Sequence, residues 1–177
     1  MGASQWERIV PTGLWGSHGH PYATRIKDSG SAGQAVVVGG AKISFVSGQE
    51  LIDSGYEKVP MQVIPNRVWA AMPTQIADGT RIAKAGATSE AAIVGRARID
   101  FHTMAELQAA GYGGKLRQVI PARVWNGLTT DIADGTYVKS PDAAAVWLVN
   151  GGRRTAASQS TGVKVIPTRV LDAIPLA

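Results

Sequence analysis

The sequence predicts an α+β protein built as a tandem array of about three units, because short patterns recur along it at a fixed spacing. An I-P-x-R-V-W pattern begins at Ile64 and again at Ile120, 56 residues later, and a third version begins at Ile166. An I-A-D-G-T pattern at 76–80 returns at 132–136. Self-similarity at such a period is typical of arrays in which each copy buries its apolar face against the next.

The repeats divide the chain into four parts. An N-terminal segment, 1–23, carries a partial copy of the I-P-x-R-V-W pattern, and the units that follow span 24–79, 80–135 and 136–177. The first two units align without insertion, whereas the third is shorter by 10 residues, lost between Arg154 and Val163. A missing helix explains this loss, so we expect the third unit to be a truncated terminal cap.

Each unit is expected to begin with short strands. Asp-Gly pairs at 78–79 and 134–135 are turn signals, and each leads into a short β-prone run. Gly-Gly at 39–40 and Asn-Gly at 150–151 supply the positive φ that a tight β-hairpin demands. The middle unit has Gly-Arg at 95–96, so its turn is expected to differ.

The second half of each unit is expected to be helix, strand and short helix. Ser47 and Thr103 are candidate N-caps, each followed three residues later by a glutamate, and a glycine stops each helix. An extended run then ends at Pro65 or Pro121, where the missing N–H costs little in the first turn of a helix. Each full unit is therefore predicted as a β-hairpin, a helix, a strand and a short helix.

Composition limits the classes of function. The chain has 177 residues and no cysteine, which excludes disulfides, thiolate nucleophiles and cysteine-type zinc sites. No apolar run reaches the roughly 20 residues of a membrane span, and residues 1–6 lack the features of a secretion signal. We therefore expect neither membrane insertion nor export by the Sec route.

The formal charge of +5 suggests anionic neighbours such as nucleic acid, wall polymers or an acidic protein. The charge is spread along the chain, and Arg153-Arg154 is the only adjacent pair of basic residues. A solvated basic surface is thus favoured over a dedicated polyanion site, which normally needs a cluster.

No catalytic set, cofactor motif or metal site is expected. The three histidines share no position in the repeats, although His18 and His20 could chelate a metal in an open loop. Asp78 and Asp134 are explained by their turns, and the repeated glutamates by helix capping. The protein is therefore predicted not to be an enzyme.

Two recurring sets of residues are candidates for ligand binding. An arginine holds the same place after the proline in each unit, and a tyrosine follows the glycine that ends the longer helix; a guanidinium beside an aromatic ring can grip a sugar or a carboxylate. The alternative is that arginine pairs with carbonyls of a neighbouring unit and tyrosine packs between units. With the basic pair, the candidates are Arg67, Arg123, Arg169, Tyr56, Tyr112, Arg153 and Arg154.

The pattern G-T-x-V-K, G-G-x-R-R and V-I-P-x-R-V-L, clearest at 135–139, 151–154 and 165–175, resembles a short repeat appended to wall-associated proteins of actinobacteria and found in proteins of their phages. Such repeats are similar to non-catalytic attachment modules. The resemblance implies a virion component, in the tail or associated with the capsid, that meets the host envelope, other virion proteins or its own copies. It would be made in the host cytoplasm.

Two alternatives stay open. One is a carbohydrate-binding module for cell-wall glycan, extracellular and wall-associated. The other, less favoured, is a binder of polyanions or nucleic acid.

Overall fold

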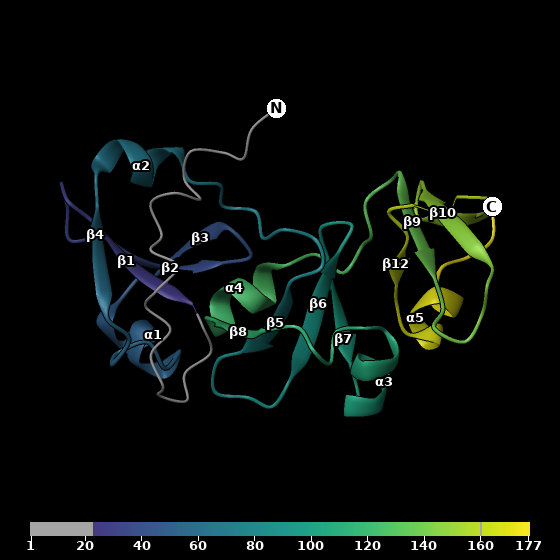
Figure 1. Ribbon diagram of the computed structural model, residues 1–177, viewed down its shortest axis with the longest axis horizontal. Coiled ribbons are helices and arrows are strands. Elements are labelled where there is room, and N and C mark those ends of the chain that lie inside the picture. The colour runs from purple at the N-terminus through teal and green to yellow at the C-terminus, as the bar shows by residue number, and fades with distance from the viewer. Residues whose placement is uncertain (1–22, 160) are drawn as a thin grey trace.

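The computed structural model describes residues 23–159 and 161–177. It contains three four-stranded sheets in a row, one in each unit, with short helices beside them (Figure 1). The expected α+β class with about three repeated units is confirmed. We call residues 24–79 unit 1, 80–135 unit 2 and 136–177 unit 3.

The elements follow the same order in the first two units. Unit 1 contains β1 (Thr24–Asp28), β2 (Gln34–Val38), β3 (Ala41–Ser44), α1 (Gly48–Asp53), β4 (Met61–Ile64) and α2 (Asn66–Ala71). Unit 2 contains β5 (Arg81–Lys84), β6 (Glu90–Val94), β7 (Ala97–Phe101), α3 (Met104–Ala109), β8 (Arg117–Ile120) and α4 (Ala122–Gly127). Unit 3 contains β9 (Thr136–Lys139), β10 (Val146–Asn150), β11 (Arg153–Ala157), β12 (Lys164–Val165) and α5 (Thr168–Ala173).

The short β-prone run after each Asp-Gly pair is a full strand inside the sheet. The strand order in unit 1 is β3-β2-β1-β4, and the other two units repeat it. β1 is antiparallel to β2 and parallel to β4, which the chain reaches only after passing through α1. A parallel partner needs such a crossover, whereas β1 and β2 are joined directly by residues 29–33, and β2 and β3 by the tight turn at 39–40.

The hairpin turn of unit 2 does not differ from the others, contrary to expectation. Gly39 and Gly40 have φ of 51° and 76°, and Gly95 and Arg96 have φ of 52° and 66°. Arg96 is the only non-glycine residue of the described chain with positive φ. The tertiary fit of the hairpin therefore imposes a glycine-like backbone on an arginine.

Helices α1 and α3 begin as predicted, but they are no longer than the others, since each of the described helices has 6 residues. The Ser47 hydroxyl accepts a hydrogen bond from the Glu50 N–H, and the Glu50 carboxylate accepts one from the Val46 N–H. Thr103 and Glu106 repeat this capping box at the start of α3. The arrangement satisfies N–H groups that have no partner inside the helix.

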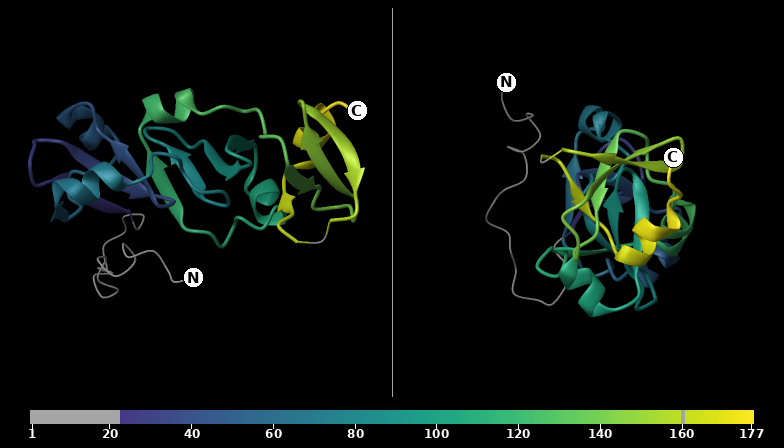
Figure 2. Two further views of the ribbon diagram at one scale, coloured as in Figure 1. Left: turned by 90° about the horizontal axis from the view of Figure 1, so that it is seen from above. Right: turned by 90° about the vertical axis from the view of Figure 1, so that its right-hand side faces the viewer.

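The hydrophobic core lies between the units, as the stacked sheets in Figure 2 indicate. We call the sheet face beside α1 or α3 the distal face, and the opposite one, beside α2, α4 or α5, the proximal face. The distal face of unit 1, with Val36 and Leu51, packs on the proximal face of unit 2, with Ile82 and Trp125. The distal face of unit 2 packs on unit 3 in the same way.

No helix in residues 23–159 and 161–177 is long and apolar enough to cross a membrane.

Candidate functional site

The repeated arginines join one unit to the next. Arg123 at the start of α4 forms an ion pair of 3.0 Å with Glu50 of unit 1, and its guanidinium also donates to the Ser44 carbonyl. Arg169 on α5 pairs with Glu106 at 3.0 Å and donates to the Asp100 carbonyl. The same glutamate thus caps its own helix and holds the next unit.

The repeated tyrosines are packed between units. Tyr56 and Tyr112 are only 1% and 5% exposed, and their rings stack at a tilt on Phe45 and Phe101. The Tyr56 hydroxyl donates to the Val119 carbonyl of unit 2 at 2.6 Å. Burial raises the pKa of Tyr56, and it raises that of Tyr112 to about 12. The structure therefore gives both tyrosines a packing role, and neither ring is available to an external ligand.

Arg154 also has a structural role, and one of its equivalents escaped the sequence analysis. Its guanidinium lies over the Trp147 ring and donates to the Leu171 carbonyl near the end of α5. Arg98 in unit 2 donates to the carbonyl of Trp125, the equivalent of Leu171, and its guanidinium lies over the Trp125 ring. Cations near a helix C-terminus satisfy carbonyls that lack partners. The signal was a basic residue at the second position of each outer hairpin strand.

Arg153 and Arg67 are the more open candidates. Arg153 is exposed and donates to the Leu176 carbonyl at 2.9 Å. Arg67 is exposed, and it forms no ion pair with the residues that the structure describes. Neither is brought beside Tyr56 or Tyr112 by any contact in this part of the chain, so the arginine–aromatic grip does not assemble around them.

A second arginine position was missed entirely. Arg25 on β1 donates to the Tyr56, Glu57 and Val59 carbonyls in the loop after α1. Arg81 makes similar bonds to the Gly113 and Lys115 carbonyls in unit 2, and it forms an ion pair of 2.6 Å with Glu90. Unit 3 has Tyr137 at this place and lacks the loop.

The Asp-Gly pairs lock the hairpin tips. Asp78 accepts hydrogen bonds from the Gly95 and Arg96 N–H groups, and Asp134 accepts one from Gly151. A Cβ on Gly95 would lie 2.4 Å from the Thr136 hydroxyl, so this hairpin tip has room only for glycine. These aspartates therefore hold structure, as the sequence suggested, but through a neighbouring hairpin and not only through their own turn.

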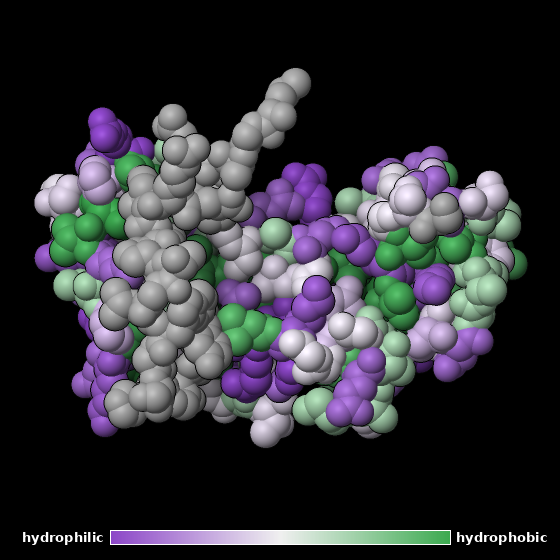
Figure 3. Space-filling view, in the orientation of Figure 1, coloured by the Kyte–Doolittle hydropathy of each residue, from purple (hydrophilic) through white to green (hydrophobic). Residues whose placement is uncertain are grey.

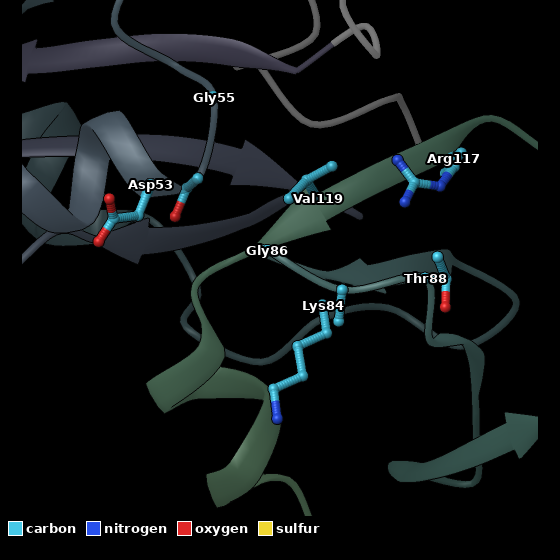
Figure 4. A pocket seen from close by; sticks show the side chains of 9 residues that line it. Asp53, Gly55, Lys84, Gly86, Thr88, Arg117 and Val119 are labelled. Carbon is cyan, nitrogen blue, oxygen red and sulfur yellow. The ribbon is translucent and has the colours of Figure 1, made fainter.

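A surface hollow lies at the junction of units 1 and 2. Two adjoining hollows of about 640 Å³ and 530 Å³ share Asp53, Ser54 and Gly86 in their walls. In Figure 4, Asp53 and Arg117 lie on opposite sides, and Lys84 extends toward α4, so the charged ends do not converge. The Ser54 hydroxyl is buried and has no hydrogen-bond partner among residues 23–159 and 161–177. We call these two hollows the junction groove.

No cluster of three or more His, Asp or Glu side chains that could hold a metal ion occurs within residues 23–159 and 161–177. His18 and His20 lie outside these residues, so the structure does not place the possible chelate.

Comparisons with known proteins give little guidance. No protein-family model matches the chain, and no curated protein matches it. Among solved structures, the chain is similar to a chain of the periplasmic assembly from the ESX-5 inner membrane complex, with 11% identity and a TM-score of 0.25. The match covers 96% of this chain and 62% of that chain. A likeness this weak carries no argument about fold or function.

Proposed function

We propose that this chain is a non-enzymatic structural and interaction protein, an array that works through contacts with other macromolecules. One observation carries the proposal. The recurring arginines Arg123 and Arg169 connect neighbouring units, because each forms an ion pair with a glutamate of the preceding unit. Catalysis would need a base and a nucleophile or metal held within reach of one another. The junction groove instead holds charged groups that point apart.

The setting that we propose is the virion of an actinobacterial phage. The chain would serve in the tail or beside the capsid, in assembly or host-surface adhesion, after synthesis in the host cytoplasm. Support comes from the resemblance of its G-T-x-V-K, G-G-x-R-R and V-I-P-x-R-V-L patterns to modules of actinobacterial wall proteins and phage proteins. Its partners would be other virion proteins or further copies of itself.

We also propose that unit 3 is the truncated cap of the array. β11 is joined to β12 by residues 158–163, where units 1 and 2 have α1 and α3. Asn150, Arg153 and Thr155 stand 56 residues after Val94, Ala97 and Ile99 of unit 2, so they occupy the equivalent distal positions. The distal face of unit 3 is therefore polar at these positions. Terminal units with a polar outer face keep a repeat array soluble.

Assembly would use exposed apolar side chains on helices α1 and α3. Ile52 on α1 is 46% exposed and Met104 on α3 is 54% exposed, and both helices lie along the lower edge of Figure 1. Light scattering on the purified protein should show oligomers, and Ile52→Glu with Met104→Glu should give monomers. A monomeric wild-type protein that sediments with purified cell walls would overturn this ordering of functions.

Binding of cell-wall glycan is the second candidate, and the junction groove is the observation that favours it. Lys84 and Arg117 line the groove, and because Arg117 is already paired with Glu90 at 2.9 Å, Lys84 is the cationic side chain that would bind an anionic glycan. In that case Lys84→Ser should weaken sedimentation with cell walls, whereas Lys164→Ser, in unit 3, should not. Equal binding of both variants to cell walls would exclude the junction groove as the glycan-binding site.

Nucleic-acid binding is the less favoured third candidate. Hydrophilic residues are scattered over units 2 and 3 in Figure 3 and do not form one stripe. Binding to phosphate backbones would be recognised by an affinity that falls steeply as the salt concentration rises.

A further inference from the structure

The distal face of unit 3 is an open sheet surface. In units 1 and 2 the distal face is apolar, and the next unit packs on it. In unit 3 the side chains of Asn150, Arg153 and Thr155 stand at the equivalent positions, and they are exposed. The right-hand view of Figure 2 looks at the array from this end. Because the face is polar, a partner that meets it must offer more than apolar surface.

The register of the strands shows which other side chains belong to this face. Tyr137 on β9 lies opposite Leu148 on β10, and Leu148 lies opposite Thr155 on β11. Residues paired in this way project from the same side of a sheet, so the three form a row that spans about 10 Å. Lys139 stands two residues further along β9 and shares the face. Val138 between them is fully buried on the opposite side.

Tyr137 replaces an arginine of the other units. Arg25 and Arg81 hold its place in units 1 and 2, and both donate to carbonyls of the loop after the helix. Unit 3 lacks that helix and its loop, so a cation at this position would have no loop carbonyls to bind. Tyr137 is partly exposed. The exchange therefore brings an aromatic ring to the open face.

The charged side chains on this face are both cationic. Strands β9, β10 and β11 contain no Asp or Glu, and their charged residues are Lys139, Arg153 and Arg154. Arg154 lies on the other side, over the Trp147 ring. Lys139 and Arg153 form no ion pair with the residues that the structure describes, and Arg153 spends one N–H of its guanidinium on the Leu176 carbonyl. Two cations without a carboxylate favour an anionic partner.

An aromatic ring beside cations on a flat sheet is an arrangement with which proteins bind single-stranded nucleic acid, because bases stack on the ring and phosphates meet the cations. We propose that the distal face of unit 3 binds single-stranded nucleic acid, with a base on Tyr137 and phosphates at Lys139 and Arg153. Thr155 adds a hydroxyl that can hydrogen-bond to a base edge. This activity goes beyond the structural role proposed above and does not depend on it.

Fluorescence anisotropy with the full-length chain and a short fluorescein-labelled oligothymidylate tests the binding. The wild type should bind at low salt, and log affinity should fall against log salt with a slope of about −1.4 for two phosphate contacts. Tyr137→Leu should weaken binding about fivefold or more, because it removes base stacking, whereas Tyr137→Phe keeps the ring and should bind like the wild type. Lys139→Gln and Arg153→Gln should each weaken binding and each reduce the slope by about 0.7.

Two controls separate this site from general attraction between charges. Arg67→Gln makes the same chemical change in unit 1, outside the proposed site, and should bind like the wild type. An abasic strand of equal length carries the same phosphates without bases, and it should bind several-fold more weakly than the oligothymidylate. Circular dichroism shows which variants keep the fold.

The proposal would be overturned by a wild type that does not bind at low salt, or by equal affinities of the wild type and Tyr137→Leu. Equal binding of the abasic strand would also overturn it, and would point instead to an acidic surface of a partner protein. The structural role is read from oligomers in light scattering, so the two proposals can fail separately.

Discussion

Arg96 has a backbone conformation that favours glycine. Its φ of 66° lies at the second turn position of the β6–β7 hairpin, where Gly40 and Gly152 have φ of 76° and 69°. A side chain in the left-handed region crowds the following carbonyl, and this costs about 1–2 kcal/mol relative to glycine. The Asp78 carboxylate, which accepts the Arg96 N–H at 3.1 Å, helps to hold this geometry.

Arg96→Gly should therefore stabilise the fold by about 0.5–1 kcal/mol, since relief of the strain exceeds the added entropy of the unfolded glycine. Urea unfolding followed by circular dichroism measures the change. Gly152→Arg is the matched reverse substitution, because an added Cβ there meets nothing within 4 Å. It should destabilise by a similar amount, and a stabilising Gly152→Arg would contradict the argument from strain.

The two buried tyrosines differ in the hydrogen bonding of their hydroxyl groups. The Tyr56 hydroxyl donates to the Val119 carbonyl at 2.6 Å, and no such bond from Tyr112 exists among the described residues. Tyr56→Phe should cost about 0.5–1.5 kcal/mol, the usual net value of one hydrogen bond. Tyr112→Phe should cost less. Thermal unfolding of the two variants checks this, and equal losses would show that the hydroxyl contributes nothing specific.

Residue patterns predicted local structure better than they predicted ligand contacts. The capping boxes at Ser47 and Thr103 depend on neighbours in the sequence, and both are confirmed. The partners of Arg123 and Arg169 lie 73 and 63 residues away, so spacing alone could not choose between a ligand and a neighbouring unit. The turn at Arg96 was expected to differ because local propensity ignores the tertiary fit of the hairpin tip.

At the scale of elements, the ion pairs between units connect helix α3 to α5. The hydrogen bond from Arg169 is the main cause that lowers the pKa of Glu106 from its usual 4.5. The ionised form is therefore favoured by folding. Its stabilising contribution is complete above the unfolded pKa and is lost as the pH falls through the folded pKa.

Arg169→Met should remove that contribution while keeping the apolar stem. The loss at pH 6–7 should be about 0.2–1 kcal/mol, because both side chains are partly exposed and the pair is screened. The difference between wild type and variant should shrink as the pH falls below 4.5, and once Glu106 is protonated in both states it should fall to the part due to the hydrogen bond from Arg169 to the Asp100 carbonyl. Urea unfolding from pH 2.5 to pH 7 measures this, and a pH-independent difference would point to lost packing instead.

The element order of each unit was predictable in part. Gly-Gly, Asp-Gly and the prolines mark turns and helix starts through local backbone physics, and they indicated the hairpins and both kinds of helix. The pairing of β1 with β4 was not predictable, because those strands are joined through α1 and their register depends on the whole sheet. Sequence patterns also gave no reason to expect the carbonyl-binding role of Arg25, whereas Arg98 could have been found from the basic residue that recurs in the outer hairpin strands.

At the scale of the whole molecule, the array has a direction. Each unit offers an apolar distal face to the proximal face of the next, and Val94, Ala97 and Ile99 of unit 2 are at most 2% exposed beneath unit 3. In unit 3 the equivalent positions hold Asn150, Arg153 and Thr155, and all three side chains are exposed. Further stacking on that face would bury polar groups without partners, which costs about 1–3 kcal/mol for each.

Removal of unit 3 should therefore expose the apolar distal face of unit 2 to water. Substituting the polar residues of unit 3 into that face should restore solubility. A chain that ends at Gly135 is expected to aggregate, because the apolar distal face of unit 2 becomes solvent-exposed. The same shortened chain with Val94→Asn, Ala97→Arg and Ile99→Thr should stay soluble and folded, as judged by light scattering and circular dichroism. The triple substitution in the full-length chain is the control, and it should destabilise the junction of units 2 and 3. If the unmodified shortened chain stays soluble and does not aggregate, unit 3 does not act as a cap.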